Sequence, residues 1–290
     1  MSGVLARVAG APISWGVCEV PGWGHQLGVD RVLSEMRGIG LRATEFGPDG
    51  FLPDDPAAKA AVLESHELAA VGGFLPLVLH DPDHDPLPGL DRVLDGFLGA
   101  GAQVVVLAAA TGLTGYDRRP ELDDADWKVL LNGLDRAAEH AASRGLRASL
   151  HPHVGTVVET GDEVTRVLEG SDVALCVDTG HLMVGGTDPA VLTRDVTDRV
   201  VHAHLKDVDA TWVGKVRAGE VTYTDAVRGG MYRPLGQGDV DIAGIVATLE
   251  GAGYQGWYVV EQDTVLDGEP AGEGPVADVR ASVTYLAGLG

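Results

Sequence analysis

Short apolar runs alternate with longer stretches of helical periodicity along almost the whole chain. The runs are rich in β-branched or apolar residues, and in the stretches between them apolar residues recur every three or four positions. This alternation is what a parallel sheet with crossover helices requires. We expect strands over Val8–Ser14, Arg42–Phe46, Val71–Leu79, Gln103–Ala108, Arg147–His151, Val173–Asp178, Val200–Lys206 and Gly256–Glu261.

The helical patterns follow these strands in order. A chain of 290 residues with about eight such units, no internal repeat and no interdomain linker predicts an α/β protein of the TIM type, a (β/α)8 barrel. We expect residues 1–290 to form this barrel as a single domain. The expected helices cover Val29–Gly38, Ala57–Ala70, Leu90–Ala100, Asp124–Arg144, Asp162–Glu169, Pro189–Val196 and Ile242–Gly253, with a closing helix near Val276–Gly288.

Two connections after strands are longer than the others. Residues 207–241 contain several arginines and aromatic residues but little periodicity, which predicts an extended loop on the face that carries barrel active sites. This loop is a candidate lid. The stretch Gly112–Asp124 is a second, weaker candidate.

Charge and cysteine content narrow the choice of partners and compartment. A net charge of −22 repels phosphate backbones and anionic membrane surfaces, so we expect neither nucleic acid nor a membrane as partner. Cys18 and Cys176 are far apart and form no disulfide framework, which fits a reducing cytoplasm. No apolar run has the length of a signal peptide core or of a membrane span. We therefore expect a cytoplasmic protein.

The last four expected strands each end in a residue that binds metal ions. His151, Asp178, His204 and Glu261 stand at the carboxyl ends, which converge on the mouth of a TIM barrel. Imidazole and carboxylate together suit transition metals, whereas all-oxygen sites favour Mg²⁺ or Ca²⁺. We predict that these four residues bind one divalent ion, with Mn²⁺ or Co²⁺ favoured over Mg²⁺, Fe²⁺ and Zn²⁺.

The strand period leaves alternatives open at two of these positions. His153 shares a strand face with His151, and His202 shares one with His204. In each pair one residue can be the ligand while the other contacts the substrate or supports the ligand.

Other polar residues near the strand ends are candidates for catalysis. His181, in the turn after the sixth strand, can contact substrate and transfer a proton, or it can stabilise the turn. Lys206 can stabilise an oxyanion in the mouth, or it can form an exposed pair with Asp207. Glu159 is either a catalytic carboxylate or an acidic residue in the first turn of a helix. Glu261 is a candidate base as well as a ligand.

The first half of the chain supplies most candidates for substrate binding. Trp15 and Glu45 suit a sugar-like ligand, because the ring offers an apolar wall and the carboxylate accepts hydrogen bonds from hydroxyl groups. Trp15 fits a core position equally well, and a glutamate at the end of a buried strand needs a partner. His80, His153 and Arg228, the last in the long loop, complete the predicted substrate contacts.

Six stretches of the chain belong together: residues 11–24 (APISWGVCEVPGWG), 44–53 (TEFGPDGFLP), 151–156 (HPHVGT), 178–181 (DTGH), 204–207 (HLKD) and 234–239 (PLGQGD). With these stretches the chain resembles the xylose-isomerase-like barrel superfamily and, within it, the inosose dehydratases, nearly from end to end. The superfamily's metal is typically held by a glutamate on the fifth strand, followed by Asp, His and Glu on the next three. His151 stands where that glutamate would fall, so either His151 or His153 can be the fifth-strand ligand.

The resemblance implies a metal-dependent hydro-lyase that dehydrates a cyclic polyhydroxy ketone, 2-keto-myo-inositol, in inositol catabolism. The alternative is a ketose isomerase or epimerase that acts through an enediolate. A DNA-repair endonuclease on the same barrel is disfavoured because no basic face is evident, and a sugar-binding barrel without activity would need no metal. The expected partner is thus a small polyol ketone, and a homo-oligomer is compatible with the sequence.

Overall fold

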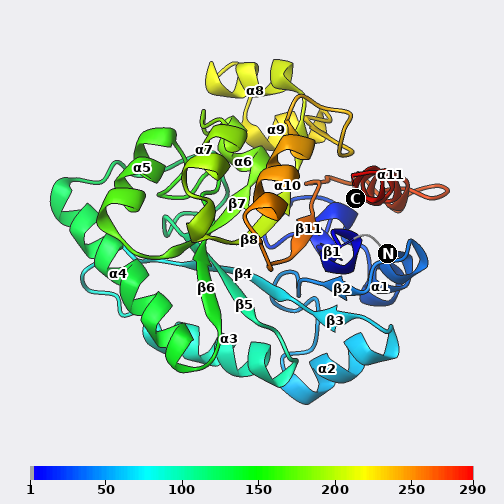
Figure 1. Ribbon diagram of the computed structural model, residues 1–290, viewed down its shortest axis with the longest axis horizontal. Helices are drawn as coiled ribbons and strands as arrows, with labels where there is room; N and C mark the ends of the chain where they lie inside the picture. The colour runs from blue at the N-terminus through cyan, green and yellow to red at the C-terminus, as the bar shows by residue number, and fades with distance from the viewer. Residues whose placement is uncertain (1–2, 290) are drawn as a thin grey trace.

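The computed structural model describes residues 3–289. Most of its strands form one nine-stranded sheet, and helices lie between them in the chain and around them in space (Figure 1). All eight predicted strands are present, although most are shorter than expected. The strands are β1 (Val8–Gly10), β2 (Ala43–Thr44), β3 (Ala69–Ala70), β4 (Gly72–Leu77), β5 (Val104–Ala109), β6 (Arg147–Leu150), β7 (Ala174–Asp178), β8 (Val200–Leu205), β9 (Asp207–Val208), β10 (Tyr232–Arg233) and β11 (Tyr258–Val260).

The barrel closes through a single bent strand. The sheet order is β3-β2-β1-β11-β8-β7-β6-β5-β4, and β3 and β4, at its two ends, are separated in the chain by Val71 alone. The N–H of Val71 donates to the carbonyl of Thr44 (3.0 Å), and its own carbonyl accepts from the N–H of Gln103 (3.1 Å). One residue therefore joins both edges, and the TIM barrel predicted from the sequence is confirmed.

The helices that follow the barrel strands surround the barrel and bury apolar side chains against it. Leu33 and Met36 of α1, Leu94 of α3, and Leu130 and Leu134 of α4 are fully buried. All eight predicted helices are found, and α6, α8 and α9 are additional. The second predicted helix was too long, because it ends at Ser65 and Ala69–Ala70 form strand β3. The helices are α1 (Val29–Gly38), α2 (Pro56–Ser65), α3 (Leu87–Gly99), α4 (Asp124–Ser143), α5 (Gly161–Gly170), α6 (Thr179–Val184), α7 (Pro189–Asp195), α8 (Ala210–Arg217), α9 (Tyr223–Arg228), α10 (Ile242–Gly251) and α11 (Val276–Ala287).

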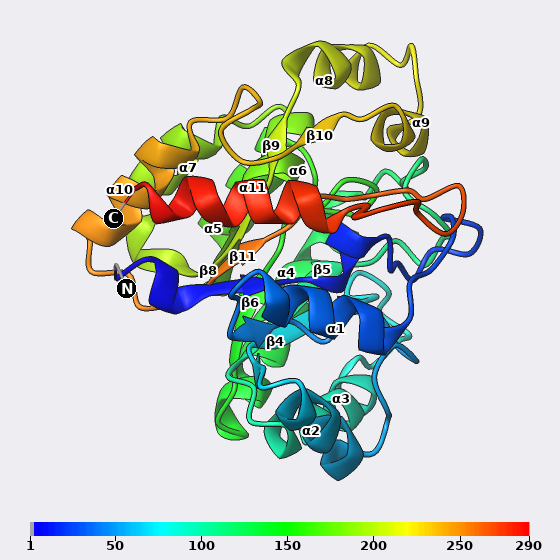
Figure 2. The same ribbon diagram turned by 90° about the vertical axis from the view of Figure 1, so that its right-hand side faces the viewer.

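The segment 207–241 is not the extended loop that the sequence predicted. It contains α8, α9 and an antiparallel pair of β9 with β10, and Figure 2 shows the two helices standing out from the body of the barrel. The side chains of Asp209 and Thr222 cap these helices by accepting bonds from the N–H groups of Thr211 and Asp225. Helices of eight and six residues are too short to produce a visible apolar period, which explains why the pattern missed them.

The first strand also ends earlier than expected. β1 stops at Gly10, and Pro12–Trp15 form a 3-10 turn. Proline cannot donate a hydrogen bond to a neighbouring strand, so the ladder stops before it.

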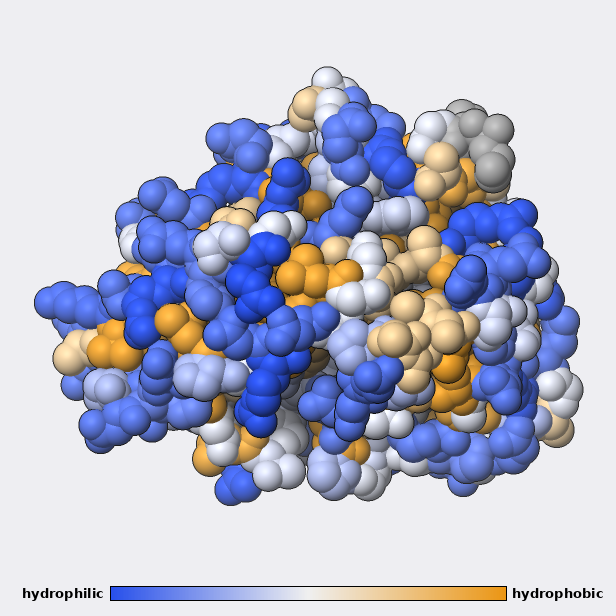
Figure 3. All heavy atoms as spheres, turned by 90° about the horizontal axis from the view of Figure 1, so that it is seen from below, coloured by the Kyte–Doolittle hydropathy of each residue, from blue (hydrophilic) through white to orange (hydrophobic). Residues whose placement is uncertain are grey.

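The surface agrees with the acidic composition. Figure 3 views the molecule from below and shows hydrophilic residues over most of this face, with smaller hydrophobic patches between them. Among residues 3–289, the large apolar side chains that are well exposed are Leu98, Leu113 and Val191. In the same range, no helix is both long enough and apolar enough to cross a membrane.

The closure point of the barrel can be tested by Gly72→Ala. A Cβ atom at Gly72 would lie 2.2 Å from the carbonyl oxygen of Val104 on the neighbouring strand, so the backbone must shift. We expect a loss of about 1–3 kcal/mol in the free energy of unfolding, as for other overpacked sites, measured by urea denaturation.

The matched control for this test is Gly89→Ala in α3. A Cβ at Gly89 meets no atom within 4 Å, and alanine is the better helix former, so the control should be neutral or slightly more stable. Equal stability of the two variants would contradict the described closure at Gly72.

Candidate active site

Four buried side chains converge at the carboxyl ends of β6, β7, β8 and β11. Nε2 of His151 lies 3.1 Å from Oδ2 of Asp178. Nδ1 of His204 lies 3.6 Å from the same oxygen and 3.2 Å from Oε2 of Glu261. The structure thus brings together the four residues that the sequence singled out as metal ligands.

The spacing of these atoms fits a metal centre. Metal–ligand bonds of about 2.0–2.2 Å place two neighbouring ligands about 3.0–3.6 Å apart, for octahedral or tetrahedral angles. The contacts of His151 with Asp178, of His204 with Asp178 and of His204 with Glu261 are 3.1, 3.6 and 3.2 Å. Ligand atoms of His151, Asp178 and His204 all lie within 4.8 Å of one another, and Glu261 joins this group through His204. Among the described residues, Nδ1 of His204 has no hydrogen-bond partner although it is buried. A buried acceptor in this position is well suited to coordinate an ion.

The charge of the cluster supports the same interpretation. Asp178, Glu261 and Asp263 all face the ammonium group of Lys206, at 3.3, 3.0 and 2.8 Å. Burial alone would lower the pKa of Lys206, but these carboxylates raise it well above its ordinary value. Against the effect of burial, Lys206 and the neighbouring histidines lower the pKa of Asp178 and Glu261. These two carboxylates exceed the single ammonium in charge even when Asp263 is protonated, and a divalent cation would offset the difference.

Asp178 has a different partner for each of its two carboxylate oxygens. Oδ1 accepts from the N–H groups of Gly180 (3.0 Å) and His181 (2.8 Å) and so caps helix α6. Oδ2 faces His151 and His204. Burial alone would raise the pKa of Asp178, but Lys206 and the neighbouring imidazoles lower it well below its ordinary value. The DTGH stretch therefore positions a charged ligand and begins a helix at the same time.

Lys206 is buried in the mouth, which excludes the exposed Lys-Asp pair. The hydroxyl of Thr179 donates to the Lys206 carbonyl (2.6 Å) and accepts from its N–H (2.8 Å). At Gly180 a Cβ would lie 2.7 Å from the Cβ of Lys206. The close approach of this turn to β8 therefore requires glycine.

Asp207 has a structural function. Its carboxylate accepts from the N–H groups of Val208 (3.0 Å), Gly236 (2.8 Å), Gly238 (3.0 Å) and Val240 (3.0 Å). Asp207 therefore connects the HLKD stretch to the PLGQGD turn and anchors this turn against the end of β8.

A cavity of about 220 Å³ lies above the cluster and is reached by His151, His153, His204, Lys206 and Glu261. It is smaller than the roughly 300–1,000 Å³ typical of pockets for drug-sized ligands, so it suits a small molecule. The remaining wall includes Trp23, Phe74 and Tyr116.

The two candidate lids meet above this cavity. The N–H of Tyr223 donates to Asp117 (3.0 Å), and the rings of Tyr116 and Tyr223 pack edge to face. Tyr223 also donates its hydroxyl to Asp263 (2.6 Å). Residues from both long connections thus reach the site.

His153 and His181 form a stacked pair beside the cluster, with ring centroids 3.7 Å apart. Nδ1 of His153 donates to the carbonyl of Val154 (2.6 Å), and His153 lines the cavity. Nε2 of His181 lies 2.9 Å from the ammonium of Lys206. Burial holds the pKa of both imidazoles well below the ordinary value, so both are neutral at neutral pH.

Glu45 reaches the cavity wall, but one of its oxygens already has partners. Oε1 accepts from Nε2 of His202 (2.8 Å) and from Nε2 of His204 (3.0 Å). The partner that a buried glutamate needs is therefore provided by β8.

Four other predicted residues lie outside the cluster. Trp15 is buried in the core, where its indole N–H donates to Glu35 (2.7 Å). Arg228 lies near the surface and pairs with Asp225 (3.4 Å). Neither residue borders the cavity.

Glu159 and His80 are the remaining two. Glu159 accepts from the N–H of Gly155 (2.7 Å) and pairs with Arg119 (3.2 Å), facing a separate open hollow. His80 does not border the cavity, and its buried Nδ1 has no hydrogen-bond partner among the described residues.

Sequence reasoning missed Asp263, Tyr116 and Tyr223 as site residues. Asp263 follows Glu261 by two positions, so the strand period that linked the histidine pairs could have placed both carboxylates on one face. The two tyrosines lie in long connections, and nothing in the sequence gives their orientation.

Comparison with known proteins identifies the family. The family described as xylose isomerase-like TIM barrel matches residues 33–286. An inosose dehydratase of Geobacillus kaustophilus (strain HTA426) is 32% identical and aligns with 97% of this chain and 93% of its own length. The rhizopine catabolism protein MocC of Rhizobium meliloti is 34% identical, with coverage of 89% and 81%. The chain therefore belongs to the xylose isomerase-like TIM barrel family.

The solved structures support the fold independently. A structure of L-ribulose 3-epimerase superposes with a TM-score of 0.70 at 15% identity, covering 98% of this chain and 94% of that chain. At this identity the likeness concerns the barrel alone.

The metal centre can be tested by Asp178→Asn. The amide oxygen can still cap α6, but the charge that faces His151 and His204 is lost, so we expect the purified protein to lose its bound divalent ion while staying folded. Elemental analysis measures the ion, and circular dichroism measures the fold.

Asp188→Asn is the matched control. Asp188 caps α7 through the same two-bond pattern but lies outside the cluster, so its metal content should not change. Full metal content in Asp178→Asn would show that Asp178 is not a ligand.

Proposed function

We propose that this chain is a metal-dependent hydro-lyase that removes water from a cyclic polyhydroxy ketone, with 2-keto-myo-inositol as its substrate. The observation that carries the proposal is the convergence of His151, Asp178, His204 and Glu261 beside the buried Lys206 at a small cavity. Relatives named inosose dehydratase, which align with almost the whole chain, support the same chemistry.

The donor set favours particular metals. Two imidazoles and two carboxylates suit Mn²⁺ or Co²⁺, and Mg²⁺, Fe²⁺ and Zn²⁺ are further candidates. When bound, such an ion supplies a Lewis acid that polarises a ketone and stabilises the enolate.

His153 is suited to remove the proton from the carbon next to the ketone. Its Nδ1 carries the hydrogen that is donated to Val154, so Nε2 keeps its lone pair. The ring is neutral because burial lowers its pKa, and it borders the cavity. A neutral imidazole with one nitrogen free of hydrogen can accept a proton as a general base.

Lys206 and Asp263 are suited to the other charges of an elimination. The Lys206 ammonium remains charged and can stabilise the negative oxygen that develops on the substrate. Asp263 borders the cavity and accepts from Tyr223, and burial raises the pKa of its carboxyl group although Lys206 opposes this. In its protonated form it can donate to the leaving hydroxyl, which departs as water. The enol product then rearranges to a dione.

The proposal predicts turnover of 2-keto-myo-inositol by the metal-loaded protein. We expect one divalent ion per chain, loss of activity on chelation and recovery with Mn²⁺ or Co²⁺. The dione product is followed by its ultraviolet absorption. A protein that binds metal but leaves this ketone unchanged would overturn the substrate, and exchange of substrate protons with solvent without loss of water would point to an epimerase or isomerase.

The role of His153 predicts a separate effect of His153→Gln. The glutamine retains polarity and approximate size but cannot accept a proton, so kcat should fall by about 10²–10⁴ while metal content stays the same. The matched control is His140→Gln, which should keep full activity. His140 is a partly exposed histidine of α4 that pairs with Asp91 of α3. Unchanged kcat in His153→Gln would remove His153 from the reaction.

A further inference from the structure

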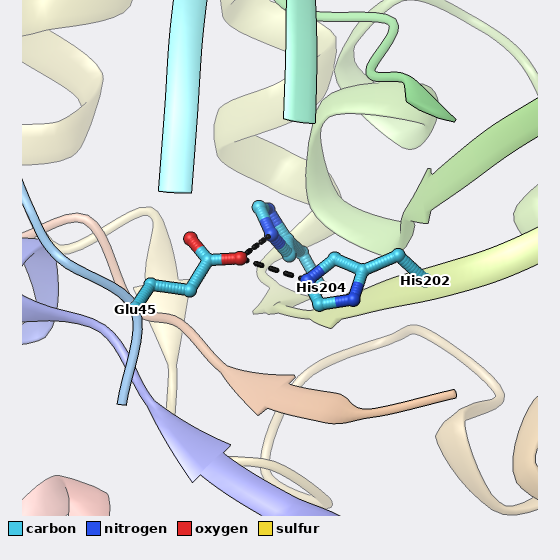
Figure 4. Close-up of side chains that lie close together, drawn as sticks. All are labelled: Glu45, His202 and His204. Carbon is cyan, nitrogen blue, oxygen red and sulfur yellow. Dashed lines mark hydrogen bonds and ion pairs between the residues drawn. The ribbon is translucent and has the colours of Figure 1, made fainter. Parts of the chain in front are cut away.

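Glu45 connects the wall of the cavity to two histidines of β8. Its Oε1 lies 2.8 Å from Nε2 of His202 and 3.0 Å from Nε2 of His204, and all three side chains are buried. Figure 4 shows the carboxylate reaching toward both imidazoles. One oxygen thus accepts from both rings.

The backbone holds Glu45 in this position. Its N–H donates to the carbonyl of Gly10 (2.9 Å), and the hydroxyl of Thr44 donates to the same carbonyl (3.2 Å). The residue directly follows β2. The carboxylate therefore projects from the wall of the barrel, opposite the strand that carries the histidines.

The contact determines where the hydrogen of His204 lies. An ionised carboxylate accepts hydrogen bonds and cannot donate them, so His204 must carry a hydrogen on Nε2. Oε1 of Glu45 lies within hydrogen-bond distance of Nε2 of both His202 and His204, so the geometry places this oxygen as the acceptor of both. A metal-binding imidazole has a single hydrogen, and with that hydrogen on Nε2 the Nδ1 atom is the one that can bind an ion. This atom lies 3.6 Å from Oδ2 of Asp178 and 3.2 Å from Oε2 of Glu261.

We propose that Glu45 is a positioning residue, which holds His204 in the tautomer and orientation that bind a divalent ion through Nδ1, while His202 holds Glu45 from the other side. Carboxylates that accept from the second nitrogen of a metal-binding histidine fix the ring and increase its basicity. The inference rests on the metal site of the proposed function. The sequence predicted Glu45 as a substrate contact, whereas this inference assigns Glu45 and His202 to the support of a metal ligand.

The same three residues could instead hold an ion of their own, since their ligand atoms lie within 4.8 Å of one another. An ion bound there would use Nε2 of His204, and a neutral ring would then present a hydrogen on Nδ1. That hydrogen would face Asp178 and Glu261, so His204 could no longer bind an ion together with these two carboxylates. The two arrangements therefore differ in the nitrogen that binds metal and in the number of ions that each variant retains.

The test compares the wild type with Glu45→Gln and His202→Gln. Metal affinity is measured by calorimetry with Mn²⁺ and Co²⁺, and the coordination of Co²⁺ by visible absorption. We expect one ion per chain in all three proteins. In Glu45→Gln the affinity should fall about 10–100-fold, as for other residues that support metal ligands, and the Co²⁺ spectrum should change. His202→Gln should have the smaller effect, because Glu45 still accepts from His204.

Two controls separate this role from loss of fold. Glu250→Gln removes a carboxylate that is held by Arg7 and Tyr258 away from the cavity, and its metal affinity should match the wild type. Nitrogen NMR of the wild type loaded with ¹¹³Cd²⁺, with histidine labelled by ¹⁵N, reports the tautomer without any variant at Glu45. We expect coupling of the metal to Nδ1 of His204 and a hydrogen on Nε2, with the signal assigned by its loss in His204→Gln.

The outcomes distinguish the inference from the proposed function. Unchanged affinity and spectrum in Glu45→Gln, or metal coupling to Nε2 of His204, would overturn the positioning role. Two ions in the wild type and one in both Glu45→Gln and His202→Gln would show that Glu45, His202 and His204 form a metal site of their own. This result would also overturn the positioning role. A wild-type protein that binds no ion would instead overturn the metal-dependent function.

Discussion

The site depends on the concentration of carboxylates in the buried mouth of the barrel. Asp178, Glu261 and Asp263 surround the ammonium of Lys206 at about hydrogen-bonding distance, and Glu45 adds a further negative charge below them. Buried charges of one sign are stable only when cations or hydrogen-bond donors face them. The lysine and the histidines supply part of this compensation. A divalent ion at the four convergent ligands would supply the rest, so stability and chemistry require the same arrangement.

The barrel meets this requirement by assigning separate tasks to individual oxygens and nitrogens. Asp178 uses one oxygen to begin α6 and the other to face the ligands. Glu45 uses one oxygen to hold two histidines. Asp207, the next residue after Lys206, directs its carboxylate to four backbone N–H groups and holds a turn outside the site. Adjacent acidic motifs therefore carry different functions, which only their hydrogen-bond partners reveal.

The long connections after the strands complete the site from above. Tyr116 and Tyr223 come from segments that the sequence described only as long, yet their rings contact each other, and Tyr223 reaches Asp263. The resulting cavity of about 220 Å³ limits the substrate to a small molecule. The candidate metal ligands come from strand ends, whereas the limit on substrate size comes partly from these connections.

The barrel and the convergence of four ligands could be predicted from the sequence. Both follow from local periodicity, because the apolar pattern marks each strand and the carboxyl ends of all barrel strands meet at one mouth. The short helices α8 and α9 give no such signal, because six or eight residues show no clear period. The direction in which each polar residue faces across the barrel wall depends instead on tertiary contacts. The indole N–H of the buried Trp15 donates to Glu35, and Glu45 accepts from a histidine 157 residues further along the chain. Such partners are brought together by closure of the barrel, and the pattern along a single strand does not predict them.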